Sequence, residues 1–189
     1  CSSLKSIPDG LFADLNDDGA EYQFHGTFFN CSGLTGSIPA TLFATVKGDV
    51  KNYMFAYTFA NCSGLTGSIP ADLFSSFSGK PPYGSLNQTF AGCTGLTGPV
   101  PATLFATLDN ENYASGTMWG IFNNTGLATS CPVGTYQFMT GFEVDFDGRV
   151  ACAPCPEGYS CAGGTATPKL EAKFTVTTTD MPAGTVFSF

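Results

Sequence analysis

The sequence predicts an α+β repeat solenoid, in which about four 31-residue repeats form a short right-handed coil before a disulfide-bonded cap and a terminal β-hairpin or strand. Three observations support this fold class. Cys31, Cys62 and Cys93 recur every 31 residues within a recurring block of sequence. Apolar residues stand at matching positions of each copy, and four more cysteines crowd residues 131–161. The expected segments are the solenoid at 1–130, the cysteine-rich cap at 131–168 and the β-strand tail at 169–189.

The recurring block begins at each of these cysteines and reads CSGLTGSIPATLF, CSGLTGSIPADLF and CTGLTGPVPATLF in turn. The first residues, CSSLKSIPDGLF, are the same block with one residue deleted, and a decayed copy begins near Asn124. One repeat cannot bury its apolar residues alone, whereas stacked repeats place like upon like. The expected core therefore consists of Phe28, Cys31, Leu34, Ile38, Leu42, Phe43, Phe59, Cys62, Leu65, Ile69, Leu73, Phe74, Phe90, Cys93, Leu96, Val100, Leu104 and Phe105.

Each repeat is expected to contain three elements. Residues 52–61 place Met54, Phe55 and Phe59 at helical spacing, which predicts a short helix. The Leu-Thr-Gly-Ser-Ile step that follows in the next block predicts a short extended segment, ended by a proline. A loop of variable sequence comes after each Leu-Phe pair. If the extended segments pair as parallel strands, adjacent repeats lie about 4.8 Å apart.

The motifs of the repeat also carry a family resemblance. Residues 54–65 contain an MFxxxFxxCxxL core, which resembles the BspA-like leucine-rich-repeat surface proteins of bacteria and some protists. The LTGSIP step is similar to the LxGxIP step of plant extracellular leucine-rich repeats. The resemblance covers roughly residues 1–130 and implies a secreted or surface-attached protein used for adhesion, matrix binding or coaggregation. The repeat is longer here than is typical of that family, so the family's binding face does not transfer to this chain.

The cysteine-rich segment begins at Cys131, where the phrases CPVGTY and CPEGY repeat each other. They resemble the CPxGxY modules of ephrin-receptor-like and TNF-receptor-like cysteine-rich regions. Four cysteines allow three pairings. We favour Cys131–Cys152 with Cys155–Cys161, because each bond closes a compact local loop. Zinc is disfavoured because no second C-x-x-C or histidine pair accompanies the one present, and a redox role is disfavoured because no helix is expected after it.

The cysteines of the repeat differ from those of the cap. Cys31, Cys62 and Cys93 occupy one column of the stacked repeats, where small buried hydrophobic side chains fit. Free buried thiols are therefore expected at these positions.

Both ends of the chain are expected to act as joints. The tail alternates apolar and polar residues and then ends within an apolar strand, whose open edge favours pairing with a neighbour unless the parent protein continues. The first coil begins within a repeat and has no polar cap over its core. The residues expected at these joints are Cys1, Leu4, Phe174, Val176, Val186, Phe187 and Phe189.

Calcium is the one metal for which the sequence offers a candidate site. Asp14, Asn16 and Asp18 match the oxygen ligands at positions 1, 3 and 5 of a calcium loop. His25 stands at position 12 where glutamate is usual, although Glu21 could substitute. The alternative is a solvated acidic turn, since short Asp/Asn/Gly clusters are common in turns.

Two covalent modifications are considered. Asn30, Asn61, Asn87 and Asn123 stand in N-x-S/T sequons, of which Asn87 is the best acceptor in a eukaryotic secretory pathway. The start Cys1-Ser-Ser is also typical of a mature bacterial lipoprotein, although this cysteine stays in register with the repeat.

Composition narrows the functional classes. A net charge of −8 with only seven basic residues excludes nucleic-acid binding and a polybasic membrane patch. The sequence contains no run of about 18 apolar residues, so no transmembrane segment is predicted. Eight cysteines indicate an oxidising compartment, so an extracellular or cell-surface location is expected. Only 12% of the residues are charged, which suits a surface that lies against a partner.

Two functions follow from these features. The first is a structural protein that self-assembles head to tail with copies of itself into a filament or surface layer. The alternative is an adhesin or ligand-binding module that uses the variable loops to hold a host or matrix protein or a glycan. No enzyme is expected, because no nucleophile or orienting group accompanies the single histidine, His25. No cofactor is expected apart from the calcium considered above.

Overall fold

The structure is a computed structural model that describes residues 3–111, 113–114, 116–138 and 146–171. These residues form no α-helix and contain only short strands in three separate sheets, so the predicted α+β solenoid is wrong. Most of the chain is a succession of hydrogen-bonded turns. The strands are β1 (Gly48–Asp49), β2 (Phe77–Ser78), β3 (Val100–Pro101), β4 (Thr135–Gln137), β5 (Ala151–Pro154), β6 (Tyr159–Ser160) and β7 (Lys169–Leu170).

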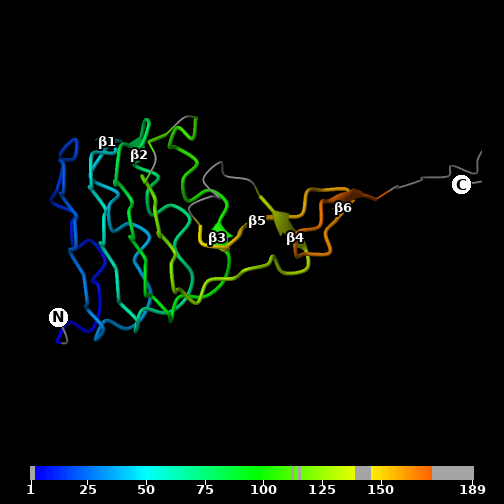
Figure 1. Ribbon diagram of the computed structural model, residues 1–189, viewed down its shortest axis with the longest axis horizontal. Coiled ribbons are helices and arrows are strands. Elements are labelled where there is room, and N and C mark those ends of the chain that lie inside the picture. Colours follow the sequence, from blue (N-terminus) through cyan, green and yellow to red (C-terminus); the bar gives the residue numbers. More distant parts are fainter. Residues whose placement is uncertain (1–2, 112, 115, 139–145, 172–189) are drawn as a thin grey trace, which may run out of the picture.

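The sheets join neighbouring parts of the chain. β1 pairs with β2 in parallel, and β6 pairs with β7 antiparallel. The three-stranded sheet has the order β3-β5-β4, in which β3 is parallel and β4 antiparallel to the central β5. Because β3 belongs to the repeats and β5 to the cysteine-rich segment, this sheet fastens the two parts together (Figure 1).

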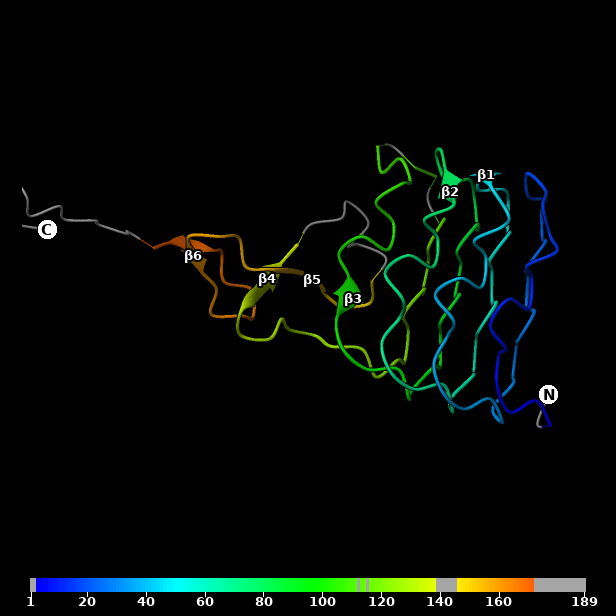
Figure 2. The same cartoon turned by 180° about the vertical axis from the view of Figure 1, so that it is seen from behind.

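The repeat copies lie side by side in chain order, from the N-terminal end to β3, with the labelled strands β4 and β6 beyond them (Figures 1 and 2). We number the copies one to four, comprising residues 3–30, 31–61, 62–92 and 93–124. Their Leu-Thr-Gly steps meet in single parallel bridges, Gly36 with Leu65 and Gly67 with Leu96. The expected parallel pairing of extended segments is thus reduced to one bridge at each step.

A ribbon of successive turns replaces the helix predicted for residues 52–61. Tyr53, Tyr57 and Asn61 have φ values of 52°, 58° and 62°, so every fourth residue is left-handed, and a right-handed helix cannot include such residues. N–H groups alternate between two kinds of partner. Ala56 donates to Tyr53 O three residues back at 3.2 Å, whereas Phe55 donates to Ser85 O of the next copy at 2.8 Å.

Each copy contains such a ribbon, and we refer to residues 21–30, 52–61, 83–92 and 116–124 as the ribbons. Left-handed residues recur at four-residue spacing in all of them. A left-handed conformation costs about 1–2 kcal/mol for a residue with a side chain. Hydrogen bonds within the copy and to the next copy offset that cost, which explains why the conformation persists at tyrosine and asparagine.

The core consists of aligned rings and aliphatic side chains, and all eighteen residues expected in it are buried. Phe59 stacks on Phe28 and on Phe90, with both centroid separations at 5.4 Å. A second column places Phe43 at 6.1 Å from Phe74. Such ring pairs add about 0.5–1.5 kcal/mol each to the free energy gained from burial.

Glycine sets how closely the copies approach. A Cβ on Gly64 would lie 2.3 Å from Leu34 O, and one on Gly95 would lie 2.3 Å from Leu65 O. These glycines therefore allow backbone to pack directly on backbone. The matching residue of copy one is Ser3.

The thiols of the repeat contribute hydrogen bonds as well as bulk. Cys62 Sγ donates to Phe28 O at 2.9 Å and Cys93 Sγ donates to Phe59 O at 3.0 Å. Both are free and buried, and burial raises the pKa of Cys62 to about 11 and that of Cys93 to about 12. Cys31 is disulfide-bonded, which corrects the expectation of a free thiol there; its partner lies outside the described residues.

The cysteine-rich segment closes the core beyond copy four. Its disulfides are Cys131–Cys152 and Cys155–Cys161, the pairing that the sequence favours. Phe146 packs against Phe105 and Phe122, with ring centroids 6.0 and 5.1 Å away. The Arg149 guanidinium donates to two backbone carbonyl oxygens that follow copy four, at 2.9 and 2.8 Å. The strands predicted after Leu170 lie outside the described residues.

Candidate binding surface

The ribbons build one outer surface of the repeats. Along each ribbon, a large apolar side chain faces the core at every fourth residue, and the outward side chains stand between these positions. In copy one, Phe24 and Phe28 are 2% and 3% exposed, whereas Tyr22 and Phe29 are 53% and 45% exposed. The exposure of the outward positions varies, since Tyr57 is half-buried and Ala56 is buried. Backbone hydrogen bonds hold neighbouring ribbons in register. We call these outward side chains the ribbon face.

The ribbon face carries few kinds of side chain. It consists almost entirely of aromatic and carboxamide groups, and the four ribbons contain no lysine or arginine. The ionisable groups other than tyrosine are Glu21 and His25. The aromatic members are Tyr22, Phe29, Tyr53, Tyr57, Tyr83 and Trp119, and the carboxamide members are Asn30, Asn52, Asn61, Asn87, Gln88, Asn123 and Asn124.

Three tyrosines form a row along one side of the ribbon face. Tyr22 stacks on Tyr53 with ring centroids 5.1 Å apart, and Tyr53 meets Tyr83 edge to face at 5.7 Å. The Tyr53 ring also covers Gly84, where a Cβ would lie 2.4 Å from it and where φ is +68°. Desolvation, followed by the neighbouring phenols of Tyr83 and Tyr22, raises the pKa of Tyr53. This phenol therefore stays neutral at physiological pH.

A shallow hollow of about 450 Å³ opens beside this row. His25, Gly26, Phe29 and Tyr57 line it, and the Tyr57 ring lies 5.7 Å from the imidazole and 6.1 Å from the phenyl ring. Gln88 Nε2 donates to Tyr57 Oη at 3.5 Å and so links the hollow to the next copy. Gly26 has a φ of +60° and leaves the floor of the hollow without a side chain.

Carboxamides border the aromatic groups. Asn61 Nδ2 donates to Asn30 Oδ1 at 2.9 Å, and Asn52 Nδ2 donates to Glu21 Oε1 at 2.8 Å, each bond joining adjacent copies. Asn87 Oδ1 is buried and has no hydrogen-bond partner within the described part of the chain. A carboxamide carries two N–H donors and a carbonyl acceptor, so it can bond hydroxyl groups as donor or as acceptor through the atoms that these bonds leave open.

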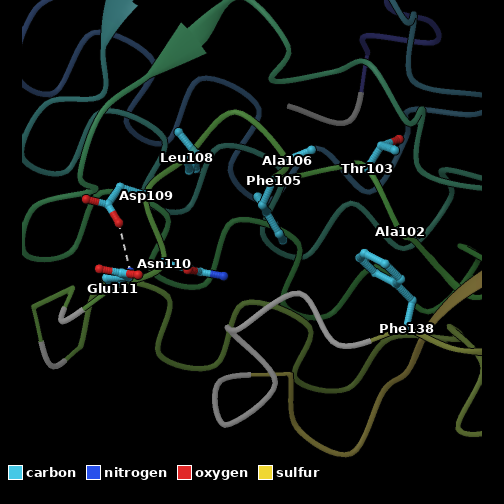
Figure 3. A pocket seen from close by; sticks show the side chains of 9 residues that line it. All are labelled: Ala102, Thr103, Phe105, Ala106, Leu108, Asp109, Asn110, Glu111 and Phe138. Carbon is cyan, nitrogen blue, oxygen red and sulfur yellow. Dashed lines mark hydrogen bonds between the residues drawn. The ribbon is translucent and has the colours of Figure 1, made fainter.

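A second cavity of about 420 Å³ lies beside copy four, where the sequence predicts a variable binding loop (Figure 3). Asp109 and Glu111 stand at one end, with Asp109 Oδ1 accepting the Glu111 N–H at 2.8 Å, and Phe138 stands at the other. Both carboxylates are exposed, and no cation from the described residues pairs with them. The cavity brings together few groups that could orient a ligand, and the ribbon face brings together many.

The residues predicted for calcium are all exposed. Asn16 Nδ2 donates to Asp14 O at 3.5 Å, and Asp18 lies on the same turn. The intervening Asp17 carboxylate accepts the Gly19 N–H at 3.1 Å, which is ordinary turn chemistry. Among the residues that the structure describes, no group of three or more His, Cys, Asp or Glu could hold a metal ion. Calcium binding stays a prediction.

The sites predicted at the ends are only partly described. Leu4 is 38% exposed at the outer side of copy one, while Cys1, Phe174, Val176, Val186, Phe187 and Phe189 lie outside the described residues. The described residues also include no helix with the length and apolar character needed to cross a membrane.

Sequence reasoning missed the ribbon face, because it assigned residues 52–61 to a helix and treated the aromatic residues as packing. A usable signal is the recurrence of tyrosine, glycine or asparagine every fourth residue, as at Tyr53, Tyr57 and Asn61.

No protein-family model, curated protein or solved structure matches the chain. The resemblance to BspA-like surface proteins and to receptor cysteine-rich modules stays a prediction.

Proposed function

We propose that this protein is an extracellular binding module of the adhesin type, which holds its partner on the ribbon face rather than on the variable loops. The observation that carries the proposal is the concentration of outward aromatic and carboxamide side chains on the ribbons of all four copies. Soluble proteins seldom expose contiguous aromatic surface unless a partner covers it. Aromatic side chains also dominate the binding energy of many interfaces, since they bury a large area at a small entropic cost.

Two further features support an extracellular role. Two disulfides hold the cysteine-rich segment, and disulfides persist in oxidising compartments. Low surface charge suits a protein that works against a matrix or a cell surface. The proposed role is binding and not catalysis.

Adhesion of protein-coated beads tests the proposal. Beads carrying the protein are offered to surfaces coated with extracellular matrix, whole cells or polysaccharides, and retention under flow is measured. We expect retention on at least one surface, and at least a tenfold loss for the Phe29→Ala/Tyr57→Ala double variant. The matched control is Val133→Ala/Leu170→Ala, which removes apolar groups that are 83% and 71% exposed on the cysteine-rich segment and at the start of the tail.

Circular dichroism and thermal melting of both variants show whether the fold is intact. Retention that is unchanged by the Phe29/Tyr57 variant, or equal to that of beads coated with an unrelated protein, would contradict a binding role for the ribbon face.

Head-to-tail self-assembly is the second candidate. It is favoured by Leu4 and Leu11, which are 38% and 43% exposed at the outer side of copy one. Ser3 opposes a neighbour stacked in the register used within the chain, because the matching glycines contact the preceding backbone directly. Negative-stain electron microscopy at high protein concentration separates the two candidates, since filaments support assembly and monodisperse particles support the binding module.

A further inference from the structure

The chemistry of the ribbon face is specific enough to select a class of ligand. We propose that the ligand is a neutral polysaccharide chain, lying across the ribbons with its sugar rings on the exposed aromatic side chains. This inference rests on the proposed binding function and names the partner of the same surface.

The ribbons lack the lysine and arginine side chains that an anionic ligand would need. The four ribbons contain no lysine or arginine, and the chain carries a net charge of −8. Sulfated or carboxylated glycans require cations to offset their charge, and nucleic acids require them for phosphate. A polyanion would be repelled from this face, so an uncharged ligand is favoured.

The aromatic groups are the second argument. A pyranose ring has an apolar face of C–H groups, which packs flat on an aromatic ring and removes apolar surface from water. Trp119 is 61% exposed and Tyr83 is 56% exposed, and both lie on the outward side of their ribbons. Phe29 and Tyr57 line the hollow of about 450 Å³. The structure thus offers several rings at the surface rather than one ring in a deep pocket.

The carboxamides are the third argument. Sugar hydroxyls both donate and accept hydrogen bonds, and a carboxamide is the uncharged side chain that does both through fixed geometry. Asn61, Gln88 and Asn123 stand between or beside the aromatic groups on successive copies. An apolar protein partner would leave these groups desolvated without hydrogen bonds, which disfavours its binding. A hydroxyl-rich chain would satisfy them.

The regular stacking of copies is the fourth argument. Neighbouring ribbons lie in register, held by backbone bonds such as Tyr57 N to Asn87 O at 2.9 Å, and each ribbon carries at least one outward aromatic and one carboxamide side chain. An extended ligand can therefore meet both kinds of group on each copy that it crosses. A chain of sugars matches this periodic surface, and affinity should rise with chain length because the later contacts are intramolecular.

Sedimentation with insoluble neutral polysaccharides tests the inference directly. Cellulose, chitin and insoluble β-1,3-glucan serve as probes, and heparin and alginate serve as anionic controls in affinity electrophoresis. We expect the protein to bind at least one neutral polymer, to ignore both anionic ones, and to bind equally between about 0.1 and 1 M NaCl, since no charge pairing is involved. Oligomers of increasing length from the bound polymer should compete with increasing strength.

Variants on the ribbon face locate the contact. Phe29→Ala/Tyr57→Ala and Trp119→Ala should each reduce neutral-polymer binding at least tenfold, while Val133→Ala/Leu170→Ala should leave it unchanged. Binding to the anionic polymers alone, or neutral-polymer binding that all these variants retain, would overturn the inference.

The two proposals fail in distinguishable ways. One outcome would indicate a protein partner. In that case bead retention depends on Phe29 and Tyr57, survives periodate oxidation of the target and occurs on no neutral polysaccharide. That outcome keeps the binding function and refutes the glycan. Loss of retention after periodate oxidation, together with binding to a purified neutral polymer, supports both.

Discussion

Replacement of Gly64 by alanine tests the direct backbone contact between copies two and three. A Cβ at this position would lie 2.3 Å from Leu34 O and 3.1 Å from Ser32 O. Ordinary contacts begin near 3.4 Å, so the two copies must separate locally by about 1 Å. Gly64 is not in the left-handed region, and the cost of the substitution is therefore steric.

The magnitude follows from the hydrogen bonds around the contact. Thr66 N donates to Gly36 O at 2.8 Å between copies two and three. Where the end of copy one adjoins this contact, Asn30 N donates to Ala60 O at 2.9 Å and Cys62 Sγ donates to Phe28 O at 2.9 Å. A separation of about 1 Å would break or seriously weaken these bonds, each of which contributes about 1 kcal/mol. We therefore expect Gly64→Ala to lower the free energy of unfolding by about 3 kcal/mol.

Gly67→Ala is the matched control within the same block. Gly67 has a φ of +79°, and the nearest atom to its Cβ position is Ser37 Cβ at 4.0 Å. This substitution adds backbone strain without a collision, at about 1–2 kcal/mol. Urea denaturation followed by circular dichroism measures both changes. If Gly64→Ala costs no more than Gly67→Ala, the close approach of the copies is not as the structure describes.

Three further predictions concern stability. Folding raises the pKa of Cys62 to about 11 and that of Cys93 to about 12, from 9.0. The thiols should therefore not change the free energy of unfolding below pH 9.0, and should lower it as the pH rises toward these two values. In urea titrations between pH 8 and 10.5, the decline should be flatter for Cys62→Ala than for the unsubstituted protein. Thr58→Val should cost about 1–3 kcal/mol, because the fully buried hydroxyl donates to Phe55 O at 2.7 Å and to Phe24 O at 2.9 Å. Thr27→Val should cost less than about 0.5 kcal/mol, because Thr27 is exposed and water can replace its bond to Phe24 O; equal costs in urea titrations would refute the role of burial. Phe146→Ala should cost about 3–5 kcal/mol, because its fully buried ring covers the end of the core; a loss below about 1 kcal/mol would show that the cysteine-rich segment does not close the core.

Side-chain burial in the repeats follows directly from the sequence. Phe28, Phe59 and Phe90 recur every 31 residues, and identical apolar groups at a fixed period can be buried only by stacking upon one another. The local disulfides follow from the same kind of reasoning, since short loops favour pairing of neighbouring cysteines. These features depend on the order of residues along the chain.

Backbone conformation within each repeat does not follow in this way. Met54, Phe55 and Phe59 suit a helix with a period of 3.6 residues and also a ribbon whose turns recur every four residues. Tyr53 and Tyr57 prefer other conformations when isolated, and bonds to the next copy stabilise them in the left-handed region. That stabilisation exists only after the copies have come together.

The candidate binding surface therefore belongs to the tertiary structure. The sequence by itself determined the repeat period, the buried columns, the local disulfides and the near absence of positive charge. Only the assembled copies decided that Tyr57 and Trp119 face solvent while Phe55 and Phe59 face the core. The physical reason is that hydrogen bonds between copies determine the backbone conformation at each position, and the backbone conformation determines the direction of the side chain.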